Sequence, residues 1–148
     1  MYFATTGLVQ VGETFDVHLY ANTAGNTDPA VGAVYVGGQT GNTVAVLDGW
    51  TDVALTTPLD FAGPGDVLVL VANRTAGVGG TSTWPATMDQ TTTQARSWAG
   101  WWNSGTTPTP PTLPPDNWTL IDAYFPGNWM VRATGAVTPA ELITLTLE

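Results

Sequence analysis

Val67-Leu68-Val69-Leu70-Val71-Ala72 is the most hydrophobic stretch of the sequence, and it decides the fold class. A turn-rich segment from Pro58 to Asp66 precedes it. A short apolar run bounded by turn residues is typical of a buried strand, and it is far shorter than the roughly 20 residues of a membrane helix. The run therefore predicts the central strand of a β-sheet.

Segments on both sides of this run also carry strand patterns. Phe15–Tyr20 alternates between apolar and polar residues, as a strand with one buried face does. The β-branched runs Val31–Val36 and Thr43–Leu47 flank a Gly-rich stretch, which predicts a hairpin with a loose loop over 37–42. Further strands are expected at Trp50–Leu55, Trp118–Ala123, Asn128–Ala133 and Leu142–Leu147.

The periodicity fades between Asn73 and Pro115, where Thr, Gly, Trp and Pro dominate. A loop of this length in a small domain is usually functional. The 17 Gly and 11 Pro residues punctuate the chain too often for long helices. The sequence predicts one all-β domain over residues 1–148, a two-sheet antiparallel sandwich of jelly-roll type with long Trp/Thr/Pro-rich loops.

Composition excludes several classes of partner. The 148 residues contain no lysine, three arginines and twelve acids, for a net charge of -9, so no basic face for nucleic acid or anionic lipid is expected. The absence of cysteine removes disulfides, thiolate nucleophiles and thiolate metal sites. Met1–Gly7 has neither a basic region nor a long apolar region, so it does not read as a secretory signal.

Residues that catalysis requires are scarce. His18 is the only histidine, and its place in an alternating segment indicates an ordinary strand residue. None of Ser82, Ser97 and Ser104 has the G-x-S-x-G context of a nucleophile. A glycosidase-like carboxylate pair stays open, although most acids occupy turns, where they bond nearby backbone. For these reasons we expect no enzyme activity and no cofactor. We also expect no metal site, because the calcium-loop spacing D-x-D-x-D-G is missing.

Tryptophan is the residue type in clear excess, with seven copies. Trp50, Trp118 and Trp129 lie in strand-like segments and are expected to be buried. Adjacent residues of an extended chain point to opposite sides, so one of the two neighbouring tryptophans after Gly100 is expected to be exposed. Exposed tryptophan suits sugar stacking or a protein interface. The candidate ligand or interface residues are Trp84, Asp89, Trp98, Trp101, Trp102 and Asn103.

The sequence from Trp50 onward resembles accessory β-sandwich domains of secreted bacterial proteins and of virion proteins of tailed phages. The resemblance covers about two-thirds of the chain and implies that the strand Asn128–Ala133 is structural. In its small size and its lack of Cys and Lys, the chain also resembles capsid decoration and minor tail proteins. The segments that carry it are Trp50–Leu55, Gly65–Val71, Trp84–Asp89, Arg96–Trp98 and Asn128–Ala133.

Two functions follow as hypotheses. The first is a non-enzymatic virion protein, a capsid decoration protein or minor tail component, that forms a homo-oligomer, with a trimer favoured. It would dock on other virion proteins, and the β-prone termini Met1–Val11 and Leu142–Glu148 could add to a neighbour's sheet. The second is a carbohydrate-binding module that uses loop tryptophans, with Asp89 or Asn103 as polar contacts.

Overall fold

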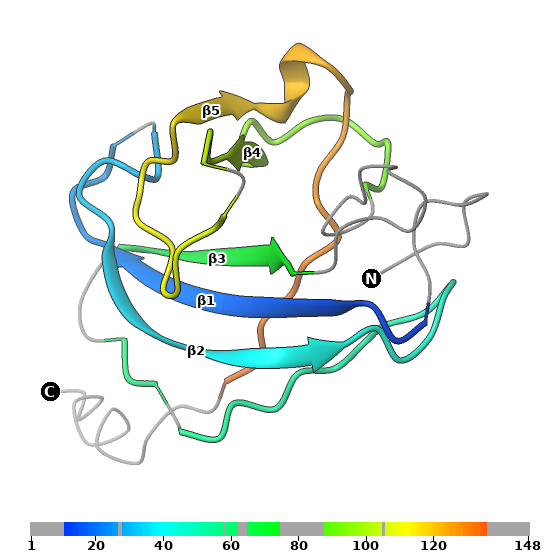
Figure 1. The fold of residues 1–148 in the computed structure, drawn as a ribbon. Coiled ribbons are helices and arrows are strands. Elements are labelled where there is room, and N and C mark those ends of the chain that lie inside the picture. Colours follow the sequence, from blue (N-terminus) through cyan, green and yellow to red (C-terminus); the bar gives the residue numbers. More distant parts are fainter. Residues whose placement is uncertain are drawn as a thin grey trace, which may run out of the picture.

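The computed structural model describes residues 11–26, 28–57, 59–61, 65–74, 88–104 and 106–135. Its larger sheet is antiparallel and has the strand order β2-β1-β3 (Figure 1). The strands of this sheet are β1 (Thr14–Asn22), β2 (Val34–Thr43) and β3 (Asp66–Asn73).

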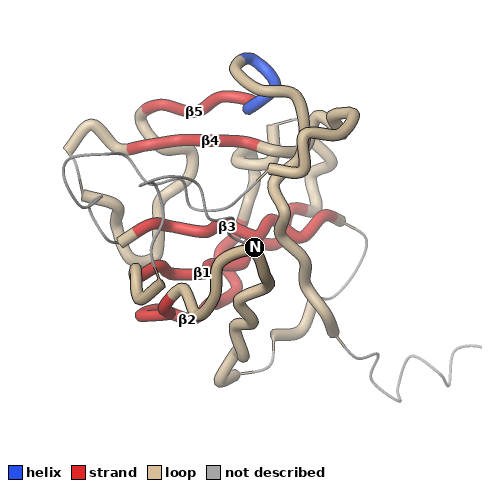
Figure 2. Tube along the Cα trace, turned by 90° about the vertical axis from the view of Figure 1, so that its right-hand side faces the viewer, coloured by secondary structure: helices blue, strands red, loops and turns tan. Residues whose placement is uncertain are grey.

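A smaller antiparallel sheet pairs β4 (Trp98–Trp101) with β5 (Asn117–Leu120), and a 3-10 turn, η2 (Ile121–Ala123), follows β5. Figure 2 shows the strands in the spatial order β5, β4, β3, β1, β2, so the small sheet lies on the β3 side of the large one. The described residues contain no α-helix. Among them there is no helix long and apolar enough to cross a membrane. The prediction of an all-β, antiparallel chain is confirmed.

β1 is the central strand, which corrects the prediction that Val67–Ala72 would be central. The predicted strand at Phe15–Tyr20 is confirmed as part of β1. The expectation that only one of its faces is buried is wrong, since Phe15, Asp16, His18 and Leu19 are all buried. One face packs on the chain that follows β2. There Phe15 and Val44 form a buried pair, surrounded by Val17, Leu47, Val53 and Val71.

The other face of β1 contacts the proline-rich segment 107–111. The Tyr20 hydroxyl donates a hydrogen bond to the carbonyl of Pro111. Burial, with a smaller contribution from Tyr35, raises the pKa of Tyr20 to about 12, so the phenol keeps the proton that it donates. Arg74 donates to the carbonyls of Thr107 and Pro108 at 2.6 and 3.2 Å. A distant loop therefore buries the polar face that the sequence pattern left to solvent.

β2 runs without a break through the glycine-rich stretch that was expected to be a loop, so the predicted hairpin over 31–47 is wrong. Gly38 permits the close pairing, because a Cβ there would lie 2.2 Å from the carbonyl oxygen of Val17. Gly41 has a φ of 68°, and its N–H donates to Asp16 Oδ1 at 2.7 Å. Two irregularities in register with β1 accommodate this backbone.

Two other predicted strands are absent from the described strands. Asn128–Ala133 contributes only an isolated bridge between Met88 and Trp129, and Trp50–Leu55 forms no ladder. Side chains connect these segments instead, since the Arg132 guanidinium lies 4.0 Å from the centre of the Trp50 ring and 3.8 Å from Asp52. The alternating pattern of these segments could not specify a backbone partner, and the two strand predictions are wrong.

The expected loop between Asn73 and Pro115 contains β4, so that prediction is wrong for Trp98–Trp101. The expected strand at Trp118–Ala123 is confirmed as β5 for its first part, whereas residues 121–123 turn into η2. The segment Leu142–Leu147 and the candidate residue Trp84 lie outside the described residues, as does all but the last residue of Met1–Val11.

Candidate binding cleft

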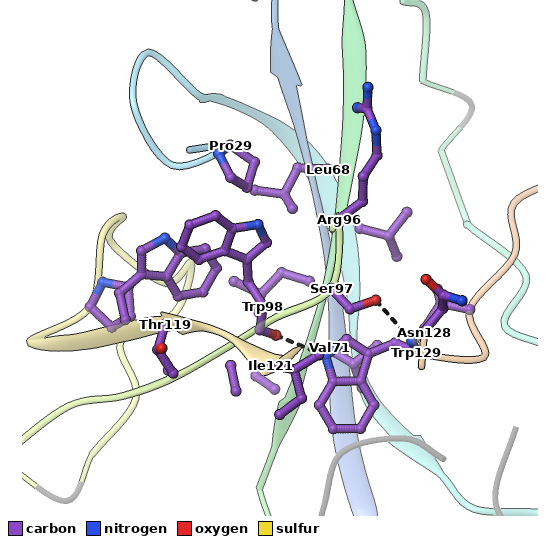
Figure 3. Close-up of a pocket in the computed structure, with 18 of the residues that line it drawn as sticks. Pro29, Leu68, Val71, Arg96, Ser97, Trp98, Thr119, Ile121, Asn128 and Trp129 are labelled. Atoms are coloured by element: carbon purple, nitrogen blue, oxygen red, sulfur yellow. Dashed lines mark hydrogen bonds between the residues drawn. The ribbon is translucent and has the colours of Figure 1, made fainter. Parts of the chain in front are cut away.

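A cleft of about 1400 Å³ lies between β3 and the β4–β5 sheet. The whole of β3 lines one side, and β4 with its flanking residues 94–97 and Trp102 lines the other. Figure 3 labels Leu68 and Val71 of β3, together with Trp98, Ile121 and Trp129, among the residues that line it. Most of the β3 wall is aliphatic, from Val67 to Ala72.

The cleft separates two strand edges. In the part of the chain that the structure describes, β3 pairs with β1 alone and β4 pairs with β5 alone. Consecutive residues of both strands line the cleft, as expected where the edge of a strand, rather than one of its faces, borders the space. β3 and β4, each paired with one other described strand, therefore both border the same cleft.

Three tryptophans build the wall on the β4 side. Trp98 and Trp118 stack across the two strands, with ring centroids 5.1 Å apart and an angle of 15° between the planes. Trp129 Nε1 donates to the carbonyl of Trp98 at 2.8 Å, and the Trp129 N–H donates to Ser97 Oγ at 2.9 Å (Figure 3). Trp118 Nε1 donates to Asp28 Oδ1 at 2.9 Å. Trp98, predicted as a ligand or interface candidate, is therefore engaged in holding the small sheet together.

Trp101 and Trp102 point to different environments, as their adjacency predicts. The Trp101 residue is 53% exposed, whereas Trp102 is half-buried and its Nε1 is buried without a hydrogen-bond partner among the described residues. Both line the cleft. Trp101 is the exposed tryptophan among those that the structure describes, and it ends β4.

A set of polar groups borders Trp101. Asn117 is its register partner on β5, and Asn117 Nδ2 donates to Asn103 Oδ1 at 2.7 Å. The Asn103 N–H donates to Asp116 Oδ2 at 2.7 Å. The structure thus brings the predicted residues Trp101 and Asn103 together. Asp116 and Asn117 were missed, and only their position just before a predicted strand could have indicated them.

Asp89 belongs to a different cluster. Its carboxylate accepts hydrogen bonds from the N–H groups of Thr91 and Asn128 at 3.0 and 2.9 Å and from Thr91 Oγ1 at 2.9 Å. These bonds, led by that of the Thr91 N–H, lower the pKa of the exposed Asp89. Asp89 therefore joins two turns, and none of its hydrogen bonds reaches Trp101 or Asn103.

The only histidine lies away from the cleft. His18 is fully buried on β1, and neither ring nitrogen has a hydrogen-bond partner in the described part of the chain. Its Nε2 is 3.8 Å from Asp16 Oδ2, beyond hydrogen-bonding distance. Burial lowers the pKa of His18, and Arg74 adds to the effect, while Asp16 opposes it. A buried, neutral imidazole at this position cannot reach a ligand in the cleft.

No group of three or more His, Asp or Glu side chains that could hold a metal ion occurs among the described residues. The cleft therefore offers aliphatic and aromatic walls, two strands that each pair with one other described strand, and one polar corner around Trp101. No protein-family model, curated protein or solved structure matches the chain.

Proposed function

We propose that this chain is a non-enzymatic structural protein that self-associates, and that the cleft accepts an extended strand of a neighbouring copy. The observation that carries the proposal is that β3 and β4, each paired with one other described strand, border one cleft. An extended segment between them can form backbone hydrogen bonds on both sides, whereas strand addition to an ordinary sheet edge uses one side.

The size and lining of the cleft support this occupant. Its volume of about 1400 Å³ exceeds the range of about 300–1,000 Å³ that is usual for small-molecule sites. The aliphatic side chains of Val67–Ala72 favour apolar side chains over sugar hydroxyl groups, because burying a hydroxyl group without a partner is costly. A peptide strand with apolar side chains fits both the large volume of the cleft and its aliphatic lining.

The donor that we propose is Leu142–Leu147. In an extended chain, Ile143, Leu145 and Leu147 share one face, and Thr144 and Thr146 share the other. Donation from one copy to the next is a head-to-tail contact, which closes into a ring when the rotation allows, and we propose a trimer.

The larger assembly that we propose for this ring is a phage virion, with the chain as a capsid decoration protein or minor tail component. The exposed apolar residues Val31, just before β2, and Val34, at its first position, supply a surface for docking on it. The jelly-roll sandwich expected from the sequence is not part of this proposal, because a strand bonded to both β3 and β4 would join the two sheets edge to edge, whereas a sandwich packs its sheets face to face.

Disulfide trapping tests the contact directly, because the chain contains no cysteine. One batch of protein would carry Val69→Cys on β3 and another Leu145→Cys, and the two would be mixed and oxidised. We expect a crosslinked heterodimer, and light scattering of the unmodified chain should give the mass of a closed ring. The matched control is Val46→Cys, which is exposed and does not line the cleft.

A monomeric mass at every concentration, together with trapping no better than in the control, would overturn the proposal. If rings form, cosedimentation with purified phage capsids and with purified tails separates the two virion locations. Binding to neither would leave a self-associating protein without the proposed virion role.

A further inference from the structure

Trp101 stands apart from the other described tryptophans. Trp50, Trp98, Trp102, Trp118 and Trp129 are all half-buried, whereas Trp101 is 53% exposed at the rim of the cleft. A single exposed apolar residue needs no explanation by itself. The groups that surround this ring provide the reason to assign it a role.

Polar groups beside Trp101 are held in place but only partly used. The bonds from the Asn103 N–H to Asp116 and from Asn117 Nδ2 to Asn103 Oδ1 fix the three side chains relative to one another. No hydrogen bond among the described residues uses Asn103 Nδ2, Asn117 Oδ1 or Asp116 Oδ1. One amide donor and two oxygen acceptors are therefore available next to an exposed aromatic ring.

We infer that Trp101, Asn103, Asp116 and Asn117 form a carbohydrate subsite for a neutral polysaccharide. The flat apolar face of a pyranose ring stacks on the indole, and its hydroxyl groups bond to the two amides and the carboxylate. A sugar hydroxyl both donates and accepts hydrogen bonds, so it matches a mixed set of donors and acceptors. An apolar peptide side chain forms no such bonds and does not match this set.

Charge selects among ligands that stack on tryptophan. Nucleic-acid bases also stack on indole rings, but their phosphates need a basic groove. This chain has a net charge of -9, and Asp116 stands within the subsite, so phosphates, sulfates and uronic acids are repelled. A neutral glycan remains as the stacking ligand.

The inference is independent of the proposed self-association. It depends on the rim of the cleft at the end of β4 and not on occupation of the space between β3 and β4. Both can hold in one molecule, and separate measurements test them.

The test uses the full chain and a panel of named polysaccharides. Retention on insoluble cellulose, chitin and xylan would be measured by sedimentation, and retardation by soluble starch and β-glucan by affinity electrophoresis. We expect at least one neutral polymer to bind, Trp101→Ala to weaken binding at least tenfold, and Asn117→Ala to weaken it by a smaller factor. Trp101→Phe, which keeps a stacking face, should recover part of the binding.

The matched control is Tyr124→Ala, because Tyr124 is an aromatic residue that is 62% exposed and also lines the cleft. It should bind like the unmodified chain. Equal binding by Trp101→Ala and the unmodified chain, equal losses in Trp101→Ala and Tyr124→Ala, or no binding to any neutral polymer would each overturn the inference. Light scattering of Trp101→Ala should give an unchanged mass, which separates this result from failure of self-association.

Discussion

The two sheets of this protein are stabilised by different means. The β2-β1-β3 sheet has long ladders, and its central strand buries charged and polar side chains, including Asp16 and His18. The β4–β5 sheet has four residues in each strand and depends on the stacked pair Trp98 and Trp118. The larger sheet buries a charged residue, Asp16, on its central strand, whereas the smaller one leaves an aromatic ring, Trp101, at the surface.

This difference assigns separate roles to the two regions. A buried charge that loses its partner is costly, so the network around β1 tolerates little change and is suited to a scaffold. A sheet of short strands with half-buried rings loses less stability when one exposed side chain is replaced. The β4–β5 sheet can therefore carry binding groups, and substitutions in each sheet test the distinction.

The largest expected effect comes from Asp16→Ala in the scaffold. The Asp16 carboxylate accepts bonds from Arg74 Nε at 2.5 Å and from the Gly41 N–H at 2.7 Å. Its removal leaves a partly buried guanidinium without its carboxylate. We expect the free energy of unfolding to fall by about 3–5 kcal/mol, measured by urea denaturation.

The control for Asp16→Ala is Asp66→Ala, which breaks the ion pair with Arg96. Both side chains of that pair are well exposed, so the expected loss is at most about 1 kcal/mol. Equal losses in the two variants would contradict the view that burial makes the Asp16 carboxylate costly to remove.

The same network shows what the sequence could predict of the fold. The alternation in Phe15–Tyr20 and the apolar run Val67–Ala72 correctly predicted strands, because side-chain period is a local property. Burial of Asp16 depends on Arg74, 58 positions away in the chain, and burial of Tyr20 on Pro111, 91 positions away. Local periodicity contains no information on such partners, and it therefore left one face of β1 exposed.

The candidate site was predictable to a similar extent. Adjacency of Trp101 and Trp102 was enough to predict that one ring is exposed. The polar partners Asp116 and Asn117 depend on the register of β4 with β5, which no local pattern encodes. Asp89 was placed near the tryptophans by its sequence position, whereas its bonds to Thr91 and Asn128 put it in another cluster.

A smaller effect is expected from Gly100→Ala, which acts within the β4–β5 sheet. A Cβ at this position would lie 2.5 Å from Pro115 Cγ and 2.7 Å from the carbonyl oxygen of Asn117. Relief of this overlap requires the strands to move, at a cost of about 1–3 kcal/mol in the free energy of unfolding. Thermal unfolding followed by circular dichroism measures it.

Gly135→Ala is the matched control, because no atom of the described residues lies within 4 Å of the Cβ that it would add. It should change stability little. Since Asn117 also belongs to the Trp101 subsite, Gly100→Ala should weaken polysaccharide binding as well. Unchanged binding in a destabilised Gly100→Ala protein would mean that the subsite does not depend on the pairing of β4 with β5.

The smallest expected effect is the pH dependence that His18 gives to the larger sheet. Burial lowers the pKa of His18 below its ordinary value of 6.5, so the unfolded chain binds a proton near pH 6.5 while the folded chain resists it. The unfolded state then holds more protons, and the free energy of unfolding falls as pH decreases below 6.5, by at most about 1.4 kcal/mol per pH unit. Urea denaturation at pH 7, 6 and 5 measures this slope, and His18→Gln should flatten it. Asp89 does not interfere, because its pKa lies below 3.8, outside this window. An equal slope in His18→Gln would assign the pH dependence to other groups and remove His18 from the description of the scaffold.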